Sequence, residues 1–324
     1  MDLRQLIRIW FKVSLWFVLA SLILFWNVRP VNFAVQPKYD FVPVKKVGKK
    51  SLSNKRVVKF TTKSQQARKI NPIQKRQFLL RLVLGALKNK HFSALDLNTY
   101  SKLCNYYSNW CNIIEIDDFD YQNKVYYTAL TIYLLEFVDK YLPALKENLD
   151  YIKIQPEKNW RRGYAGHHSI IMNVKKNMSY KQFFEVLTHE MGHVVDLWVL
   201  NGDSWFKSKK FTEFWKVVFA KNDPSLEFYK LCWQSEKIKK PDVYISDFVS
   251  WYGMTDPFED FAETFNMYLN HNWVFQQMSS ESNILRQKYN FMAKLFNWNY
   301  IRADKNFDYK IGFRPWDSTT FISE

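Results

Sequence analysis

The spacing of apolar residues divides the chain into an apolar start, a polar stretch and a longer region with helical periodicity. Residues 9–28 are apolar or uncharged apart from Lys12. About 20 such residues suffice to cross a bilayer. We therefore predict a transmembrane anchor within residues 1–29. A cleaved signal peptide is the alternative, because Arg4, Arg8 and Lys12 form a charged start, but no small-residue cleavage site follows. The charged start favours an amino end inside and the remaining chain outside.

The polar stretch, residues 30–70, reads as a flexible basic linker. Residues 38–76 hold 13 Lys or Arg and one acid, Asp40. The linker can lie on anionic lipid or on an acidic envelope polymer, or act as a plain solvated tether. The net charge of +16 also suits nucleic acid. We expect no nucleic-acid partner, because the chain carries no base-stacking or zinc-finger pattern and a membrane span is predicted.

Helical periodicity begins at Asn71 and predicts a helical subdomain over residues 71–148. One helix carries Phe78, Leu82 and Ala86, and a later one runs through Val125 and Val138. Beyond it, residues 149–324 mix short strands with helices. The predicted fold class is therefore α+β, mostly helical, with a small sheet.

Within residues 149–324, residues 151–154 and 168–174 read as strands, and the second is bounded by Gly163 and Gly166 on one side and by residues 175–177 on the other. A helix is expected over residues 180–200, with Ser179 as its N-cap and apolar residues on nearly all faces, which is typical of a buried helix. Asp256 and Pro257 begin another helix, and residues 283–298 form a closing one.

Candidate chemistry lies on the first of these helices, in the order His189-Glu190-Met191-Gly192-His193. Residues four apart share a helix face, so His189 and His193 can bind one metal ion, with Glu190 beside a metal-bound water. Zinc suits this pair, because its catalytic sites use three protein ligands and keep one position open. Asp196 follows on roughly the same face and either orients a histidine or is a solvated or capping residue.

We expect the third ligand on the helix that starts at Pro257. Glu259 lies three residues after the N-cap Asp256, which assigns it to a capping box. Glu263 lies one turn further on, away from the apolar stripe, and is the preferred ligand. Glu259 and Asp260 remain substitutes, either of which can instead hold a histidine in place.

This arrangement resembles the zincin metallopeptidases with a glutamate third ligand, most closely the lethal-factor-type and related zinc-binding metallopeptidases. These pair a first motif like His189-Glu190-x-x-His193 with a later Phe-Ala-Glu, here Phe261-Ala262-Glu263. The resemblance covers roughly residues 150–300 and implies that His189, His193 and Glu263 bind one zinc ion, with Glu190 as general base. The chain lacks the third His of metzincins and has no Asp four residues after Glu263.

The resemblance also implies an oxyanion donor and a substrate-binding strand. Tyr252 is the first candidate donor, with His168 and Tyr164 as alternatives. By analogy with zincins, the strand at residues 168–174 is expected to be a sheet edge that pairs with an extended peptide. Cys104 and Cys111 either pair, if their side of the membrane is oxidising, or remain buried thiols like Cys232.

Together these features predict a membrane-anchored zinc metallopeptidase that hydrolyses peptide bonds, with its catalytic domain outside the cytoplasm. The alternative is a non-catalytic envelope protein that keeps the same fold for binding or as a scaffold. An intact Glu190 argues against that alternative, since a scaffold needs no general base. A secreted protease released by cleavage in the linker is a third possibility.

Overall fold

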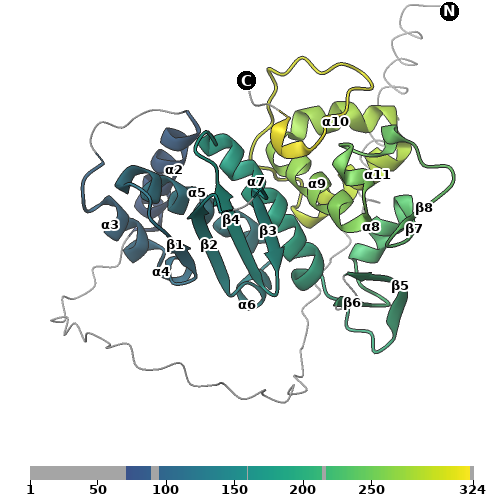
Figure 1. Cartoon of the computed structure of the whole chain (residues 1–324), viewed down its shortest axis with the longest axis horizontal. Helices are drawn as coiled ribbons and strands as arrows, with labels where there is room; N and C mark the ends of the chain where they lie inside the picture. Colours follow the sequence, from purple (N-terminus) through teal and green to yellow (C-terminus); the bar gives the residue numbers. More distant parts are fainter. Residues whose placement is uncertain (1–70, 89–94, 159, 214–216, 322–324) are drawn as a thin grey trace, which may run out of the picture. The chain divides into compact units, whose positions relative to one another are not determined.

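The computed structural model of this chain describes residues 71–88, 95–158, 160–213 and 217–321 (Figure 1). They fall within one contact unit, Ser64–Glu324. The predicted anchor, residues 1–29, and the linker, residues 30–70, lie outside the described residues, so both stay predictions. Within the described part of the chain, no helix combines the length and apolar character that a membrane crossing requires.

Helices dominate the described residues. The α-helices are α2 (Pro72–Leu87), α3 (Thr99–Tyr106), α4 (Ser108–Cys111), α5 (Tyr121–Tyr141), α6 (Leu145–Asn148), α7 (Tyr180–Val194), α8 (Ser225–Cys232), α9 (Pro257–Asn270), α10 (Asn272–Glu281) and α11 (Asn283–Leu295). A π-helical turn, η1 (Val195–Val199), continues α7, and 3₁₀ turns occur at η2 (Ile245–Asp247), η3 (Tyr252–Met254) and η4 (Ser318–Thr320).

The strands form one four-stranded sheet and two small hairpins. They are β1 (Ile114–Ile116), β2 (Tyr151–Pro156), β3 (Gly163–Gly166), β4 (Ser169–Val174), β5 (Lys207–Glu213), β6 (Val217–Ala220), β7 (Trp233–Ser235) and β8 (Ile238–Lys239). The sheet order is β1-β2-β4-β3, parallel except for β3, which runs antiparallel to β4. The expected α+β class with a small sheet is thus confirmed, and β1 brings residues from before position 149 into the sheet.

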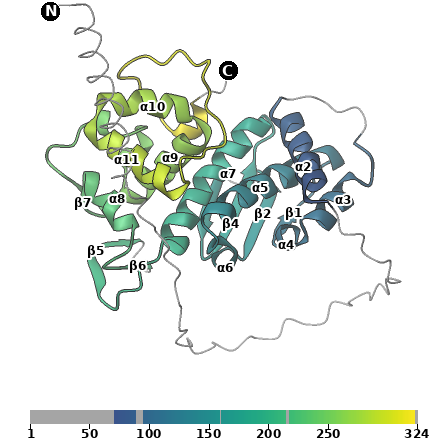
Figure 2. The same ribbon diagram turned by 180° about the vertical axis from the view of Figure 1, so that it is seen from behind.

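One face of this sheet is covered by helices. Figure 2 shows α5 in front of the strands, and Figure 1 shows α7 between the sheet and the helices α9 to α11. Ile152 and Ile154 of β2 are fully buried on the helix side, whereas Lys153 between them forms a 2.7 Å ion pair with Glu115 of β1. This alternation is expected of a sheet with one covered face.

Polar side chains begin the helices where the sequence predicts. Asn71 caps α2, Ser179 accepts from the Gln182 N–H at the start of α7, and Asp256 accepts from the N–H groups of Phe258 and Glu259 in α9. Each cap satisfies amide groups that the first helical turn leaves without partners. The predicted helices over these segments are confirmed.

The predicted edge strand is wrong in one respect. Residues 169–174 do form β4, but β4 lies between β2 and β3, so β3 is the edge. The sequence reads Gly163 and Gly166 as boundaries of a strand, because glycine is depleted in strands. In the structure, these residues delimit the edge strand itself.

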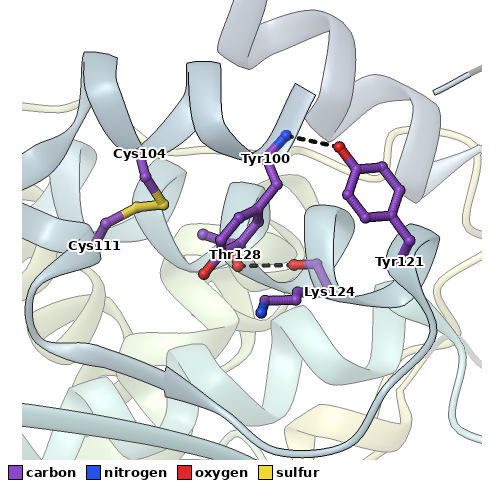
Figure 3. The surroundings of a disulfide bond; sticks show 6 residues. All are labelled: Tyr100, Cys104, Cys111, Tyr121, Lys124 and Thr128. Atoms are coloured by element: carbon purple, nitrogen blue, oxygen red, sulfur yellow. Dashed lines mark hydrogen bonds between the residues drawn. A yellow bond between two sulfur atoms is a disulfide. The ribbon is translucent and has the colours of Figure 1, made fainter. Parts of the chain in front are cut away.

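A disulfide joins α3 to α4 through Cys104 and Cys111, and the remaining cysteine, Cys232, is buried and free (Figure 3). Of the two alternatives for the first pair, the structure therefore has the disulfide. The Tyr121 hydroxyl nearby accepts from the Tyr100 N–H at 3.1 Å. The bridge and this bond fix the short helices ahead of β1.

A buried ion pair fixes α11 against α9. The Lys288 ammonium lies 2.7 Å from both oxygens of Asp260, and both side chains are fully buried. Asp260 also accepts from the Trp233 indole N–H at 3.1 Å. Burying one charge without the other costs far more than burying the pair, so this contact sets the rotation of α9.

We expect Lys288→Met to lower the free energy of unfolding by about 3–5 kcal/mol, because Asp260 would remain buried without its cation. Lys294→Met is the matched control, since Lys294 lies exposed on the same helix and should change stability by no more than about 0.5 kcal/mol. Urea denaturation of both variants measures the difference. Equal stability of the two variants would contradict a structural role for the pair.

Candidate metal centre

The centre begins with α7, which is buried along nearly its whole length. Its apolar residues surround two imidazoles and a carboxylate that are also buried: His189 and Glu190 are each 7% exposed, and His193 is 9% exposed. Burying such groups costs free energy unless they are paired or bind a metal. The two imidazole ring centres lie 5.0 Å apart, one helical turn from each other.

Gly192 allows α9 to approach this face of α7. A Cβ at this position would lie 2.9 Å from Ala262 Cα and 3.3 Å from Phe265 Cβ, which is closer than side chains normally pack. The glycine that weakens the helical pattern in the sequence therefore has a packing role. It brings the acidic residues of α9 within reach of the histidines.

Two glutamates of α9 meet the histidines from different sides. Glu259 Oε2 lies 3.2 Å from His189 Nε2 and 3.4 Å from His193 Nε2. Glu263 Oε1 lies 2.9 Å from the other nitrogen of the first ring, His189 Nδ1. Glu259 thus faces the space between the imidazoles, whereas Glu263 lies behind His189.

The three groups around that space are placed so that they could hold a metal ion. One ligand atom from each of His189, His193 and Glu259 lies within 4.8 Å of the others. Bonds of about 2.0–2.1 Å at tetrahedral angles place neighbouring ligand atoms about 3.3 Å apart. The two measured distances to Glu259 agree with that value, and the donors are of the nitrogen and oxygen types that zinc uses.

Glu259 therefore occupies the position that the sequence analysis assigned to Glu263. The physical reason lies at the start of α9, where Asp256 satisfies two amides by itself and leaves the Glu259 carboxylate available. Glu263 is fully buried and is neither on a solvated face nor between the two imidazoles. With Glu259 as the third donor, an acidic residue does follow four positions later, namely Glu263.

The electrostatics of the centre favour charged imidazoles when no metal is bound. Burial opposes protonation of His193, but Glu259 outweighs it and raises the pKa of His193 to about 9. Burial likewise opposes protonation of His189, and Glu259 and Glu263 raise its pKa above the usual value. Burial alone would raise the pKa of Glu259, yet the two histidines hold it well below its usual value. A metal ion must therefore displace protons from the histidines.

Glu190 lies beside this centre and under the edge strand. A Cβ on Gly163 of β3 would come within 2.7 Å of Glu190 Oε1, so the absence of a side chain there makes room for the carboxylate. Burial raises the pKa of Glu190, against the opposing charges of His189 and His193. A carboxylate with a raised pKa is better suited to take up a proton.

Of the three candidate oxyanion donors, Tyr252 is brought to the centre. Its hydroxyl donates to Glu259 Oε1 at 2.9 Å, and its ring centre lies 6.2 Å from that of His189. The His168 ring instead contacts Trp198 at 4.3 Å and has Nδ1 2.9 Å from Asn148 O. Tyr164 follows Gly163 on β3, and successive residues of a strand point to opposite faces. Gly163 faces Glu190, so the Tyr164 side chain points away from it.

Asp196 and Asp260 have partners outside the centre. Asp196 is fully buried in η1 and accepts a hydrogen bond from the Tyr229 hydroxyl, so it is not a solvated residue. Asp260 binds Lys288 on the other side of α9.

Sequence reasoning missed residues that approach the centre from far along the chain. The sequence predicts Gly163 as a strand boundary and gives no signal for Arg162 and Asp317, which form a 2.9 Å ion pair. Ser318 was also missed, although its backbone N–H donates to Glu263 Oε2 at 2.6 Å. No local pattern marks Arg162, Asp317 and Ser318, because their partners lie 55 or more positions away.

Comparison with protein-family models, with curated proteins and with solved structures finds no match for this chain. The resemblance to zincins therefore rests on the motif residues of the sequence alone.

Proposed function

We propose that the chain is a zinc-dependent metallopeptidase whose ligands are His189, His193 and Glu259 and whose general base is Glu190. The observation that carries this proposal is that the three donors lie at distances that suit zinc. The buried carboxylate of Glu190 lies next to them and forms an ion pair with none of the three. A scaffold would have no use for that buried carboxylate, which costs stability.

The protein groups divide the work of peptide hydrolysis. Zinc, when bound, activates a water molecule and polarises the scissile carbonyl. Glu190 accepts the proton of the attacking water at its carboxylate and passes it to the leaving amine. The raised pKa of Glu190, which follows from its burial, suits both proton transfers.

The edge strand β3 is the proposed docking site for the substrate backbone. The Asn173 N–H donates to Arg162 O at 2.8 Å, and Gly163 lies opposite Met172. Because hydrogen-bonded pairs alternate along an antiparallel ladder, the N–H and C=O groups of Gly163 and Ala165 point away from β4. An extended peptide can add to this edge and place its scissile bond beside Glu190.

Tyr252 is the proposed oxyanion donor. Its hydroxyl donates a hydrogen bond to Glu259, which is a ligand in this proposal. A small rotation of the Tyr252 side chain would therefore bring the hydroxyl to a carbonyl oxygen near the zinc. Burial, and then the charge of Glu259, raise the pKa of Tyr252, so the hydroxyl keeps its proton and remains a donor at neutral pH.

We further propose that the catalytic domain faces the outside of the cell, attached through the anchor predicted at residues 9–28. The Cys104–Cys111 disulfide supports this location, because such bonds persist in oxidising compartments. The basic linker would then lie against anionic lipid or an acidic envelope polymer, and the substrate would be a peptide or protein outside the membrane.

The ligand assignment predicts different losses of zinc affinity for the two glutamates of α9. Glu263→Ala keeps all three donors and should weaken binding about 10- to 100-fold, as is typical when the partner of a ligand histidine is lost. Glu259→Ala removes a donor and should weaken it more. Competition with a chromophoric chelator measures both affinities. The reverse order would return the ligand role to Glu263.

The position of the base predicts a selective loss of turnover from one added methyl group. Gly163→Ala places a Cβ against Glu190 and should lower kcat towards that of Glu190→Gln, for which we expect a loss of about 10²–10⁴-fold. Both variants should retain zinc. Gly166→Ala on the same strand meets nothing within 4 Å and is the matched control. Full activity of Glu190→Gln on a peptide library would exclude this mechanism.

The proposed location predicts the thiol count of the protein isolated from its own host. After denaturation without reductant and with alkylation from the start, one of the three cysteines, Cys232, should react with maleimide. Mass spectrometry after reduction should then reveal Cys104 and Cys111. Three reactive thiols before reduction would place the domain in a reducing compartment.

A further inference from the structure

The segment at residues 314–321, here called the strap, runs across the metal centre near the carboxyl end of the chain. Both of its ends are fixed. Arg314 is buried, donates to Phe248 O at 2.7 Å, and lies 3.1 Å from Glu281 of α10. At the other end, the Phe321 ring packs 4.6 Å from Phe307 and 5.3 Å from His271, measured between ring centres.

The middle of the strap meets Glu263. The Ser318 N–H donates to Glu263 Oε2 at 2.6 Å, while Glu263 Oε1 lies 2.9 Å from His189 Nδ1. The Ser318 hydroxyl accepts from Asn266 Nδ2 at 2.9 Å, one turn further along α9. A buried carboxylate is thus held at one oxygen by the strap and presents the other to the imidazole.

The neighbouring residues of the strap meet the two other parts of the centre. Pro315 O accepts from the Trp251 N–H at 3.0 Å, and Trp316 O accepts from the Tyr252 N–H at 2.8 Å, which holds the turn that carries the Tyr252 hydroxyl. Asp317 pairs with Arg162, the residue that precedes Gly163 on the edge strand. Four consecutive residues therefore contact the Tyr252 turn, the edge strand and the carboxylate behind His189.

We propose that the strap is a positioning element of the metal centre and that its Ser318 amide acts through Glu263 on His189. This proposal rests on the function proposed above and extends it to a segment far from the motif. A carboxylate that binds the second nitrogen of a ligand histidine fixes the tautomer and rotation of the ring. Glu263 can do so only while its own rotation is fixed, and the amide of Ser318 fixes it.

Proline at position 318 removes this amide, and its Cδ takes the place of the amide hydrogen, so the Glu263 carboxylate must also move away. Ser318 is the first residue of η4, where the backbone angle of proline is compatible with the turn. The preceding residue, Asp317, has φ −136° and ψ 158°, in the region that a residue before proline prefers. Ser318→Ala is the matched control, because it keeps the amide and removes only the hydroxyl.

We expect Ser318→Pro to weaken zinc binding on the order of 10- to 100-fold and to alter the visible absorption spectrum of the Co²⁺-substituted protein. Ser318→Ala should lose less affinity and keep the wild-type Co²⁺ spectrum. In the Glu263→Gln background, Ser318→Pro should add little further loss, because the two changes interrupt the same path. Wild-type affinity and spectrum in Ser318→Pro, or full additivity with Glu263→Gln, would overturn the proposal.

Removing the strap after folding provides a second measurement if Ser318→Pro does not fold. Gly312 is exposed and has a φ of 80°, and a specific protease site inserted directly after it leaves its N–H bonded to Glu281 at 3.2 Å. Zinc affinity should fall at least as far once the strap has been cleaved and separated, and unchanged affinity would overturn the proposal. Failure of the wild-type chain to bind zinc would instead refute the proposed function itself.

Discussion

The close contact between α7 and α9 is the constraint on which the rest of the centre depends. It exists because Gly192 has no side chain at the point where Ala262 crosses it. Two histidines on one helix and two glutamates on the other can then interact over distances of 2.9–3.4 Å. A larger residue at either position would separate the helices and pull the donor atoms apart, although every motif residue would still be present. The geometry of the centre is therefore a consequence of helix packing.

Burying this many charged groups demands compensation, and α9 provides it on two sides. Glu259 and Glu263 are four residues apart and share the face towards α7, whereas Asp260 is rotated away and pairs with Lys288 of α11. The three acids are close in sequence, but two of them pair with the histidines and the third pairs with Lys288. Breaking either set of pairs would leave a charge in an apolar interior, which is costly. The ion pair to α11 thus helps to set which face α9 turns towards the histidines.

The centre is also assembled from segments that are distant in the sequence. The edge strand places Gly163 over Glu190, and Ser318 reaches Glu263 from 55 positions along the chain. Arg162 and Asp317 join those two segments to each other. The histidine motif supplies ligands and a base, but other segments orient them. The motif can therefore be short, although the centre involves residues from much of the described chain.

The elements that depend on local physics can be predicted from the sequence. Helical periodicity and the polar caps Ser179 and Asp256 located α7 and α9, and the spacing of His189 and His193 placed both on one face. Helical periodicity could not show that Glu259 faces both imidazoles while Glu263 lies behind one, because it relates residues within a helix and not the rotation of one helix against another. Only the tertiary contacts show that β3, and not β4, is the edge, because strand order depends on pairings between distant segments.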